Sequence, residues 1–246
     1  PLGTVLGITP FNFPAMVPMW MFPLALATGN SFILKPSEKD PLGSIFITEL
    51  FNKTKAPKGL LNLVNGDKKT VETLISDKRI KAVSFVGSTP VAKKVYELSS
   101  ISGKRCQALG GAKNHALILS DANIDYTTDQ LISAAFGSSG QRCMALSVAV
   151  VSVEIKNEFL KILKEKVLKL KFGSEDLNSN SFGPLVTIEH LKSVENNIKI
   201  AEEEGAEIIV DGRDIFNRKN SKSGFFLGPT VIDKVNSNMQ SYKNEI

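Results

Sequence analysis

The feature that most constrains the fold of this chain is an alternation of short apolar runs with helical patterns over residues 4–100. The apolar runs are TVLGIT, SFILKP, LLNLVNG and IKAVSFVG. The helical patterns that follow them cover residues 14–28, 41–53, 68–76 and 90–100. Strands that are apolar along their whole length and are separated by helices pair in parallel, with helices on both faces of the sheet. The pattern therefore predicts an α/β fold with a doubly wound parallel sheet.

Residues 1–34 contain no charged side chain, and the stretch is long enough to span a bilayer as a helix. Proline interrupts it at positions 10, 14, 18 and 23, and no cationic segment precedes it. Because proline breaks helix interiors and a signal peptide opens with a cationic region, we expect neither a membrane span nor a signal peptide. A buried strand, a loop, a buried helix and a second buried strand fit the stretch better.

A second pattern begins after the glycine pair Gly110–Gly111, where we place the boundary between a first domain, 1–111, and a second, 112–246. Strands are expected in the second domain at residues 115–121, 145–154, 207–212 and 226–235, and helices at 127–137, 157–173 and 188–206. The polar stretch 217–224 is interpreted as a surface excursion. The second domain is therefore also expected to be α/β.

The formal net charge of +5 comes mostly from scattered lysines. A nucleic-acid surface needs clustered arginines with interleaved aromatic residues, so the lysines are interpreted as solvated helix faces and no nucleic-acid partner is expected. Two cysteines are too few for a disulfide framework, and they fit a reducing compartment or a single reactive thiol. The two histidines lack metal-ligand spacing, so no metal site is expected.

Two motifs at the ends of predicted strands could bind a nucleotide. In FVGSTP, the strand ends at Gly87 and Ser88 precedes a helix that opens with Pro90, which leaves free backbone N–H groups for a phosphate. In LKPSE, Lys35 and Glu38 follow a buried strand and could bond ribose hydroxyl groups. An ordinary capped helix and an ordinary pair of solvent charges explain the same residues. No G-x-G-x-x-G occurs, so the usual Rossmann fingerprint is absent.

Two further motifs carry groups suited to acyl chemistry. Asn12 in TPFNFP could satisfy its amide within its own turn, or direct its NH₂ group at a developing oxyanion. Cys143 in SSGQRCMALS follows Gly140 and adjoins Arg142, a residue that is costly to bury without an anionic partner. Read alone, Cys143 could equally be a small apolar packing residue, as Cys106 in RCQAL is expected to be.

The motifs TPFNFP, LKPSE, FVGST, GQRC, GPTV and NEI occur in one order, and that order resembles the aldehyde dehydrogenase superfamily over essentially all 246 residues. The chain looks like the middle of a family member, and we expect the usual N-terminal and C-terminal segments to be missing. The resemblance implies that 1–111 is a partial NAD-binding domain and that 112–246 is a partial catalytic domain that carries the thiol.

The resemblance also implies roles for single residues. Cys143 would be the nucleophile, and Asn12 would form the oxyanion hole together with the Cys143 backbone N–H. Phe13, next to Asn12, would contact the substrate. The residues implied to bind NAD are Phe11, then Lys35 and Glu38 at the adenosine ribose, Gly87 and Ser88 at the pyrophosphate, and Glu245 at the nicotinamide ribose.

One departure from the family pattern indicates a branch. Hydrolytic members carry a glutamate general base in an ELGGK-like motif, and the aligned position here is Leu109, or Ala108 after a shift of one. Neither side chain can take a proton from water. The chain resembles the non-hydrolytic methylmalonate-semialdehyde dehydrogenase (malonate-semialdehyde dehydrogenase, acetylating) branch in FNFPAMVPMWMFPLA, GAKNHALILSDAN and GQRCMAL. That branch usually has a polar residue at the position of Leu109.

This second resemblance implies NAD-dependent oxidation of malonate or methylmalonate semialdehyde through a Cys143 thioester. The carboxylate would leave as CO₂ and coenzyme A would take the acyl group, giving acetyl-CoA or propionyl-CoA. Arg142 would bind the substrate carboxylate, which its guanidinium fork matches. A hydrolytic aldehyde dehydrogenase with another base and a non-catalytic truncated relative are the alternatives. The full-length protein is expected to be a homo-oligomer (dimer or tetramer) without a membrane partner, mitochondrial in a eukaryote and cytoplasmic in a bacterium.

Overall fold

The computed structural model describes residues 1–172, 181–215 and 224–246. It divides into two compact units, Pro1–Gly111 and Ala112–Ile246, so the division falls directly after the glycine pair. Within the described residues, no helix is both long and apolar enough to cross a bilayer. The surface excursion expected at 217–224 lies outside the described residues except for Gly224.

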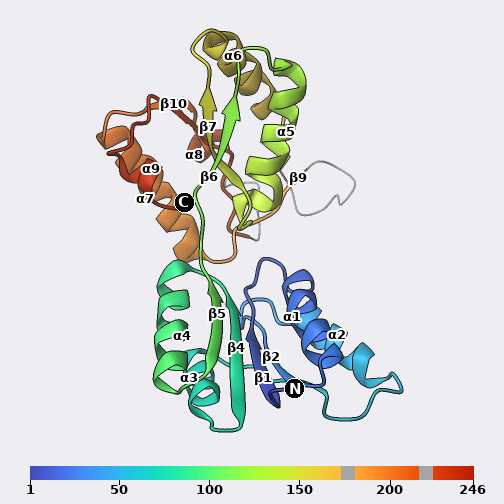
Figure 1. Cartoon of the computed structure of the whole chain (residues 1–246). Helices are drawn as coiled ribbons and strands as arrows, with labels where there is room; N and C mark the ends of the chain where they lie inside the picture. Colours follow the sequence, from blue (N-terminus) through green and yellow to red (C-terminus); the bar gives the residue numbers. More distant parts are fainter. Residues whose placement is uncertain (173–180, 216–223) are drawn as a thin grey trace. The chain divides into compact units, whose positions relative to one another are not determined.

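Unit 1 is a five-stranded parallel sheet with helices on both faces (Figure 1). Its elements in chain order are β1 (Thr4–Ile8), α1 (Met16–Ala27), β2 (Ser31–Lys35), α2 (Leu42–Asn52), β3 (Leu61–Leu63), α3 (Lys68–Ser76), β4 (Ile80–Val86), α4 (Thr89–Ile101) and β5 (Arg105–Leu109). The strand order is β3-β2-β1-β4-β5, and every neighbouring pair is parallel. The predicted doubly wound α/β fold is confirmed for this unit.

The strands of unit 1 supply a core to each layer of helices. Val5 of β1 belongs to a cluster with Phe22 of α1 and Phe32 of β2, against which α2 also packs. The next residue, Leu6, belongs to a cluster on the other face with Val95 of α4. Successive side chains of a strand point to opposite faces, so the continuous apolar runs serve both layers. Burying each of these side chains contributes about 1.5–3 kcal/mol.

Helix α1 differs from the buried helix expected for residues 14–28. It contains Pro18 in its first turn, where the missing N–H costs no helical hydrogen bond, and Pro23 further along. Val17 and Phe22 are buried, whereas another side of the helix exposes Met16, Met19, Trp20 and Leu24. The apolar composition of α1 therefore predicts its position beside the sheet but not the exposure of that side.

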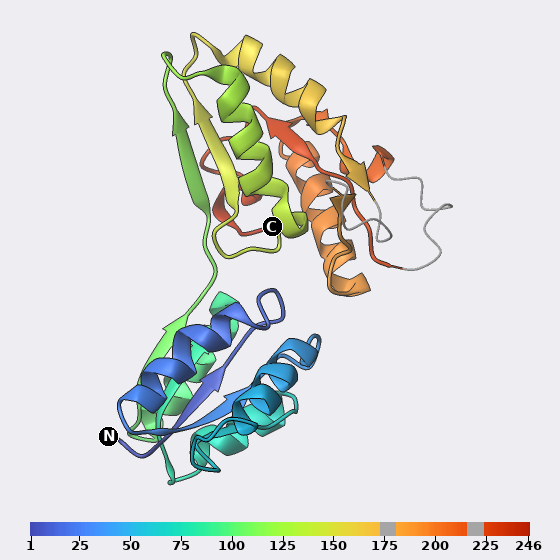
Figure 2. The same ribbon diagram turned by 90° about the vertical axis from the view of Figure 1, so that its right-hand side faces the viewer.

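Unit 2 combines three short strand pairs with helices. Its elements are β6 (Asn114–Ile118), α5 (Ile124–Phe136), the 3-10 turn η1 (Gly137–Gly140), β7 (Leu146–Val151), α6 (Lys156–Val167), β8 (Lys171–Phe172), β9 (Ser181–Phe182), α7 (Ile188–Glu203), β10 (Glu207–Val210), α8 (Gly212–Ile215), β11 (Val231–Asp233) and α9 (Gln240–Lys243). Pairs β6–β7 and β8–β9 are parallel, and β10–β11 is antiparallel. Helices α5 and α6 pack beside β6 and β7 through Ile118, Leu131 and Phe159 (Figure 2). A second cluster, around Leu191 and Ile198, holds α7.

Two predicted boundaries in unit 2 are wrong. The helix expected over 157–173 ends at Val167: Leu168 is exposed, Lys171–Phe172 form β8, and residue 173 lies outside the described residues. The strand expected over 226–235 shrinks to β11, since Pro229 has no N–H for a ladder. The N–H of Gly228 donates to the Gly212 carbonyl at 3.0 Å, outside the strand pair.

Candidate active site

The carboxyl ends of the five parallel strands in unit 1 lie at one edge of the sheet. Strands β1 and β4 are neighbours, and the chain runs from β1 to β2 on one side and from β4 to β5 on the other, so the direction of the connections switches between β1 and β4. In parallel α/β sheets such a switch point opens a ligand-binding crevice at the carboxyl edge. The loop with Asn12 follows β1, and the turn with Gly87 and Ser88 follows β4. The structure therefore places these predicted site residues on the two sides of the switch point.

Lys35 is the last residue of β2 and is only 4 % exposed. Its Nζ atom lies 3.2 Å from Oε2 of Glu38, which is exposed. Partial burial raises the pKa of Glu38, but its backbone hydrogen bond and the Lys35 ammonium outweigh this and hold the pKa below its ordinary value. The structure thus brings Lys35 and Glu38 together as a charged pair at the edge of the sheet, with the carboxylate on the outside.

The turn after β4 presents backbone N–H groups at the same edge. A Cβ atom on Gly87 would stand 2.5 Å from the Phe85 ring, so the position requires glycine. Ser88 precedes α4 in an extended conformation, and its side chain makes no capping hydrogen bond. The first amides of α4 are consequently left for another acceptor, in the arrangement that binds phosphate at helix N-termini.

The loop between β1 and α1 is anchored at both sides of Asn12. The N–H of Thr9 donates to the Lys35 carbonyl at 3.1 Å. On the other side, the Pro14 carbonyl accepts a 2.7 Å hydrogen bond from Ser44, which is fully buried. Asn12 is half-buried between these anchors, as are Phe11 and Phe13. The residues expected to line the oxyanion hole and the adjacent subsites thus lie on a fixed loop.

In unit 2, Cys143 lies in a loop that reverses direction between η1 and β7. Ser138, Ser139 and Gly140 all have positive φ, at 55°, 54° and 74°. Two consecutive non-glycine residues in this region store about 1–3 kcal/mol of strain each. The surrounding contacts hold the turn, since Ser139 Oγ donates to the Gly183 carbonyl at 2.6 Å and Gln141 Oε1 accepts from the Val186 N–H at 3.0 Å.

Asn114, the first residue of β6, holds the other side of this loop. Its Nδ2 atom donates to the carbonyls of Cys143 and Ala145 at 3.0 and 2.9 Å. Cys143 itself is half-buried and its thiol is free. One side-chain amide therefore fixes the peptide plane that follows Cys143 and the one that follows Ala145, next to the thiol.

Arg142 folds back over the start of the same loop. A Cβ atom on Gly137 would stand 2.5 Å from Arg142 Nη2, so the guanidinium lies against the Gly137 backbone. Arg142 is half-buried, and it forms no ion pair with any carboxylate in the described part of the chain. A guanidinium that is partly desolvated and has no described ion-pair partner can bind an anionic ligand.

Glu245 lies in the segment after α9, close to two basic side chains. Lys113 Nζ donates to the Asn244 carbonyl at 2.8 Å. Burial lowers the pKa values of Lys113 and His190, and the Glu245 carboxylate opposes both shifts. Sequence reasoning missed Lys113 and His190, because residues so far apart in the chain give no local signal of contact. The motif GAKNH marked the segment but not its contacts.

Leu109, at the position expected for a general base, is the last residue of β5 and is 46 % exposed. Its side chain cannot accept a proton. Among the residues with described positions, no group of three His, Cys, Asp or Glu side chains could hold a metal ion. Of the predicted site residues, Asn12, Lys35, Glu38, Gly87 and Ser88 thus belong to unit 1, and Arg142, Cys143 and Glu245 belong to unit 2.

Comparison with known proteins gives a consistent set of relatives. A family profile described as "Aldehyde dehydrogenase family" matches residues 1–246. Malonate-semialdehyde dehydrogenase of Bacillus cytotoxicus is 49% identical over 246 residues, and that of Pseudomonas aeruginosa is 48% identical over 247. Each alignment covers 100% of this chain and 50% of the relative. The chain therefore spans about half the length of the curated relatives it matches.

The chain is also similar to solved structures of semialdehyde dehydrogenases, and it again covers half of each. Methylmalonate-semialdehyde dehydrogenase DddC of Oceanimonas doudoroffii matches with a TM-score of 0.94 and 51% identity, over 100% of this chain and 50% of that one. A Sinorhizobium meliloti protein assigned as methylmalonate-semialdehyde dehydrogenase and complexed with NAD matches with a TM-score of 0.95 and 46% identity, over 99% of this chain and 50% of that one.

Proposed function

This chain belongs to the aldehyde dehydrogenase family, and from that membership we propose that the full-length protein oxidises malonate or methylmalonate semialdehyde with NAD and coenzyme A. In this proposal Cys143 is the nucleophile and carries the acyl group as a thioester. The curated relatives named malonate-semialdehyde dehydrogenase, at 48–49% identity, support the substrate class.

The carboxyl edge of unit 1 fits NAD. The uncapped amides at the start of α4 and the close approach that Gly87 permits suit a pyrophosphate. Lys35 and Glu38 would bond the adenosine ribose, and the exposed Glu38 carboxylate would repel a 2′-phosphate. We assign Phe11 to the same cofactor and Glu245 to the nicotinamide ribose. Bound NAD supplies the hydride acceptor that none of the side chains can provide.

Cys143 would attack the aldehyde carbon as a thiolate. The negative charge that develops on the aldehyde oxygen would be stabilised by the Asn12 side-chain amide and by the Cys143 N–H. That N–H has no backbone acceptor within the described residues, and the hydrogen bonds from Asn114 hold the adjacent carbonyl. Loss of hydride from the tetrahedral adduct then leaves a thioester on Cys143. Phe13, on the same loop as Asn12, would contact the substrate.

The observation that carries the substrate class is the position of the Arg142 guanidinium. It is half-buried beside Cys143, lies against Gly137, and forms no ion pair with a described carboxylate. Leaving such a charge unpaired is costly in free energy, and a substrate carboxylate would form a bidentate ion pair with the guanidinium. A semialdehyde with a carboxylate close to its aldehyde group meets this requirement, whereas a simple alkyl aldehyde does not.

Leu109 decides the fate of the acyl group in this proposal. With no proton acceptor there, hydrolysis of the thioester lacks a base. The thioester formed from malonate semialdehyde carries a β-carboxylate, whose departure as CO₂ leaves an enolate that takes up a proton. The thiol of coenzyme A then displaces Cys143, which releases acetyl-CoA, or propionyl-CoA from the methyl-substituted substrate.

The test is NADH formation by the full-length protein with a panel of aldehydes, with and without coenzyme A. We expect turnover with both semialdehydes only when coenzyme A is present, and about one equivalent of NADH per Cys143 when it is absent. Propanal, which lacks the carboxylate, is the control and should react with a much higher KM. Steady NADH release without coenzyme A would instead favour the hydrolytic alternative.

A further inference from the structure

Three consecutive residues at the start of β6, Lys113, Asn114 and His115, fasten two separate segments of unit 2. We propose that this KNH tripeptide positions two functional segments of unit 2, the loop with the Cys143 thiol and the segment with Glu245. Asn114 would hold the thiol loop, and Lys113 with His115 would hold the segment that presents Glu245. The roles of Cys143 and Glu245 in this inference rest on the proposed function.

The direction of the side chains explains how one tripeptide can serve two segments. Along an extended chain, successive side chains point to opposite faces. Asn114 points toward the thiol loop, and both of its amide N–H groups donate hydrogen bonds, one to the Cys143 carbonyl and one to the Ala145 carbonyl. Lys113 and His115 point the other way, toward residues 242–244.

His115 makes two directed contacts on that other side. Its Nδ1 atom lies 2.8 Å from the Lys113 carbonyl, which can only accept, so Nδ1 is the donor in this contact. Its Nε2 atom forms a hydrogen bond with the Tyr242 hydroxyl at 3.1 Å. The two rings also meet edge to face, with centroids 5.3 Å apart. Together with the bond from Lys113 to the Asn244 carbonyl, these contacts fix the chain on the N-terminal side of Glu245.

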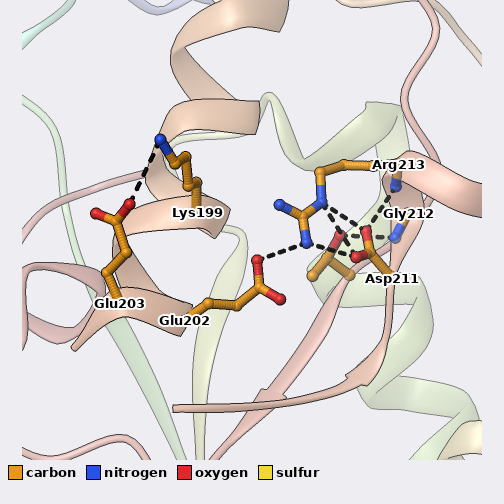
Figure 3. A network of polar contacts seen from close by, with 7 residues as sticks. Lys199, Glu202, Glu203, Asp211, Gly212 and Arg213 are labelled. Carbon is orange, nitrogen blue, oxygen red and sulfur yellow. Dashed lines mark hydrogen bonds and ion pairs between the residues drawn. The ribbon is translucent and has the colours of Figure 1, made fainter. Parts of the chain in front are cut away.

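The other end of this segment is fastened independently. The N–H of Gln240, the first residue of α9, donates to both carboxylate oxygens of Glu204, at 3.1 and 2.8 Å. Glu204 follows α7, whose last turn is tied by Arg213 to the start of α8 (Figure 3). The Arg213 guanidinium forks between Asp211 and Glu202. With the start of α9 fixed in this way, loss of Lys113 or His115 should release only the end that carries Glu245.

The test compares variants of the full-length protein by three readouts: amide hydrogen exchange in residues 240–245, the dissociation constant for NAD, and the rate at which iodoacetamide labels Cys143. Lys113→Met should speed exchange and weaken NAD binding about tenfold, while labelling stays within about twofold of wild type. Lys113→Arg should restore the exchange rate and the affinity for NAD. Tyr242→Phe should also speed exchange and weaken NAD binding, but less than Lys113→Met does. Asn114→Ala should change the labelling rate at least about fivefold and leave NAD binding unaltered.

Lys161→Met, on the exposed face of α6, is the matched control and should change nothing. If Lys113→Met and Asn114→Ala alter all three readouts alike, the tripeptide merely stabilises the unit and the inference is overturned. If neither variant alters any readout, it is overturned as well. The expected division of effects in a protein that forms no NADH from either semialdehyde would support the positioning roles and refute the proposed function.

Discussion

The Arg142 guanidinium lies directly against the Cα atom of Gly137, where a Cβ atom would stand 2.5 Å from Nη2. The backbone of Gly137, at φ −54° and ψ 135°, is open to any residue, so the glycine is needed for space and not for conformation. The position of a charged group beside the proposed nucleophile thus depends on a missing methyl group five residues earlier in the chain.

Gly137→Ala should therefore displace Arg142 without removing its charge. We expect the KM for malonate semialdehyde to rise about tenfold, because the bidentate geometry is lost, while the KM for propanal stays nearly constant. Steady-state kinetics with both aldehydes measure this. Gly183→Ala is the matched control, since no atom of the described residues lies within 4 Å of its Cβ position. Equal effects on both aldehydes would contradict a carboxylate-binding role for Arg142.

The two cysteines should differ in reactivity. Cys106 packs against the core cluster of β4 and α4, whereas Cys143 lies in a loop. Brief treatment with iodoacetamide should label Cys143 at least about tenfold faster than Cys106, because an accessible thiolate is the reactive species. Peptide mass spectrometry measures the two rates, and addition of NAD should change that of Cys143. Slow, equal labelling would support the non-catalytic alternative.

The pair of Lys35 and Glu38 should make stability depend on pH. Because the pKa of Glu38 is lowered in the folded state, its carboxylate contributes stability above about pH 4.5, the ordinary value, and the contribution is lost as the pH falls through the lower, folded value. Glu38→Gln should lower the free energy of unfolding by about 1 kcal/mol at pH 7, and the difference should vanish in acid.

Urea titrations of the full-length protein at several pH values measure this difference. Glu97→Gln is the control, because Glu97 pairs with Lys94 at 3.7 Å with both side chains more than half exposed. That variant should match wild type at every pH. A difference between Glu38→Gln and wild type that persists at pH 3 would count against the ion pair as its source.

Leu109→Glu should introduce the base that hydrolysis lacks. Leu109 is about half exposed at the end of β5, so a carboxylate there can stay solvated. We expect NADH release without coenzyme A to continue beyond the first equivalent, at a rate at least about tenfold above wild type. Leu109→Gln has nearly the same shape but cannot accept a proton. If the two variants behave alike, Leu109 does not decide the fate of the acyl group.

The sequence predicts the architecture of unit 1 well, for a physical reason. Runs such as IKAVSFVG are apolar on both faces, and only a sheet covered on both sides buries all of them. Strand ends are also local features, so the edge that gathers Asn12, Lys35 and Gly87 follows once the strands are known to be parallel. The helix expected over 157–173 ends early because Lys171–Phe172 pair with β9, and the pattern of residue types does not contain that long-range pairing.

The contacts that assemble unit 2 were not predictable in the same way. Lys113 meets Asn244, and His115 meets Tyr242, across more than 120 residues of chain. No periodicity or motif encodes such a pairing. The glycine at 137 gave no signal either, since its reason is a side chain that folds back over it. Long-range polar contacts of this kind emerge only from the tertiary structure.

The exposed side of α1 gives the chain an optical reporter of its own. Trp20 is the single tryptophan in the sequence, and it lies on that side of the helix, in unit 1. Tryptophan emission during denaturation of this chain therefore follows the melting of unit 1 alone, whereas circular dichroism follows the helices of both units. Coincident transitions by the two methods would mean that the two units unfold cooperatively. Separate transitions would show that one unit unfolds before the other.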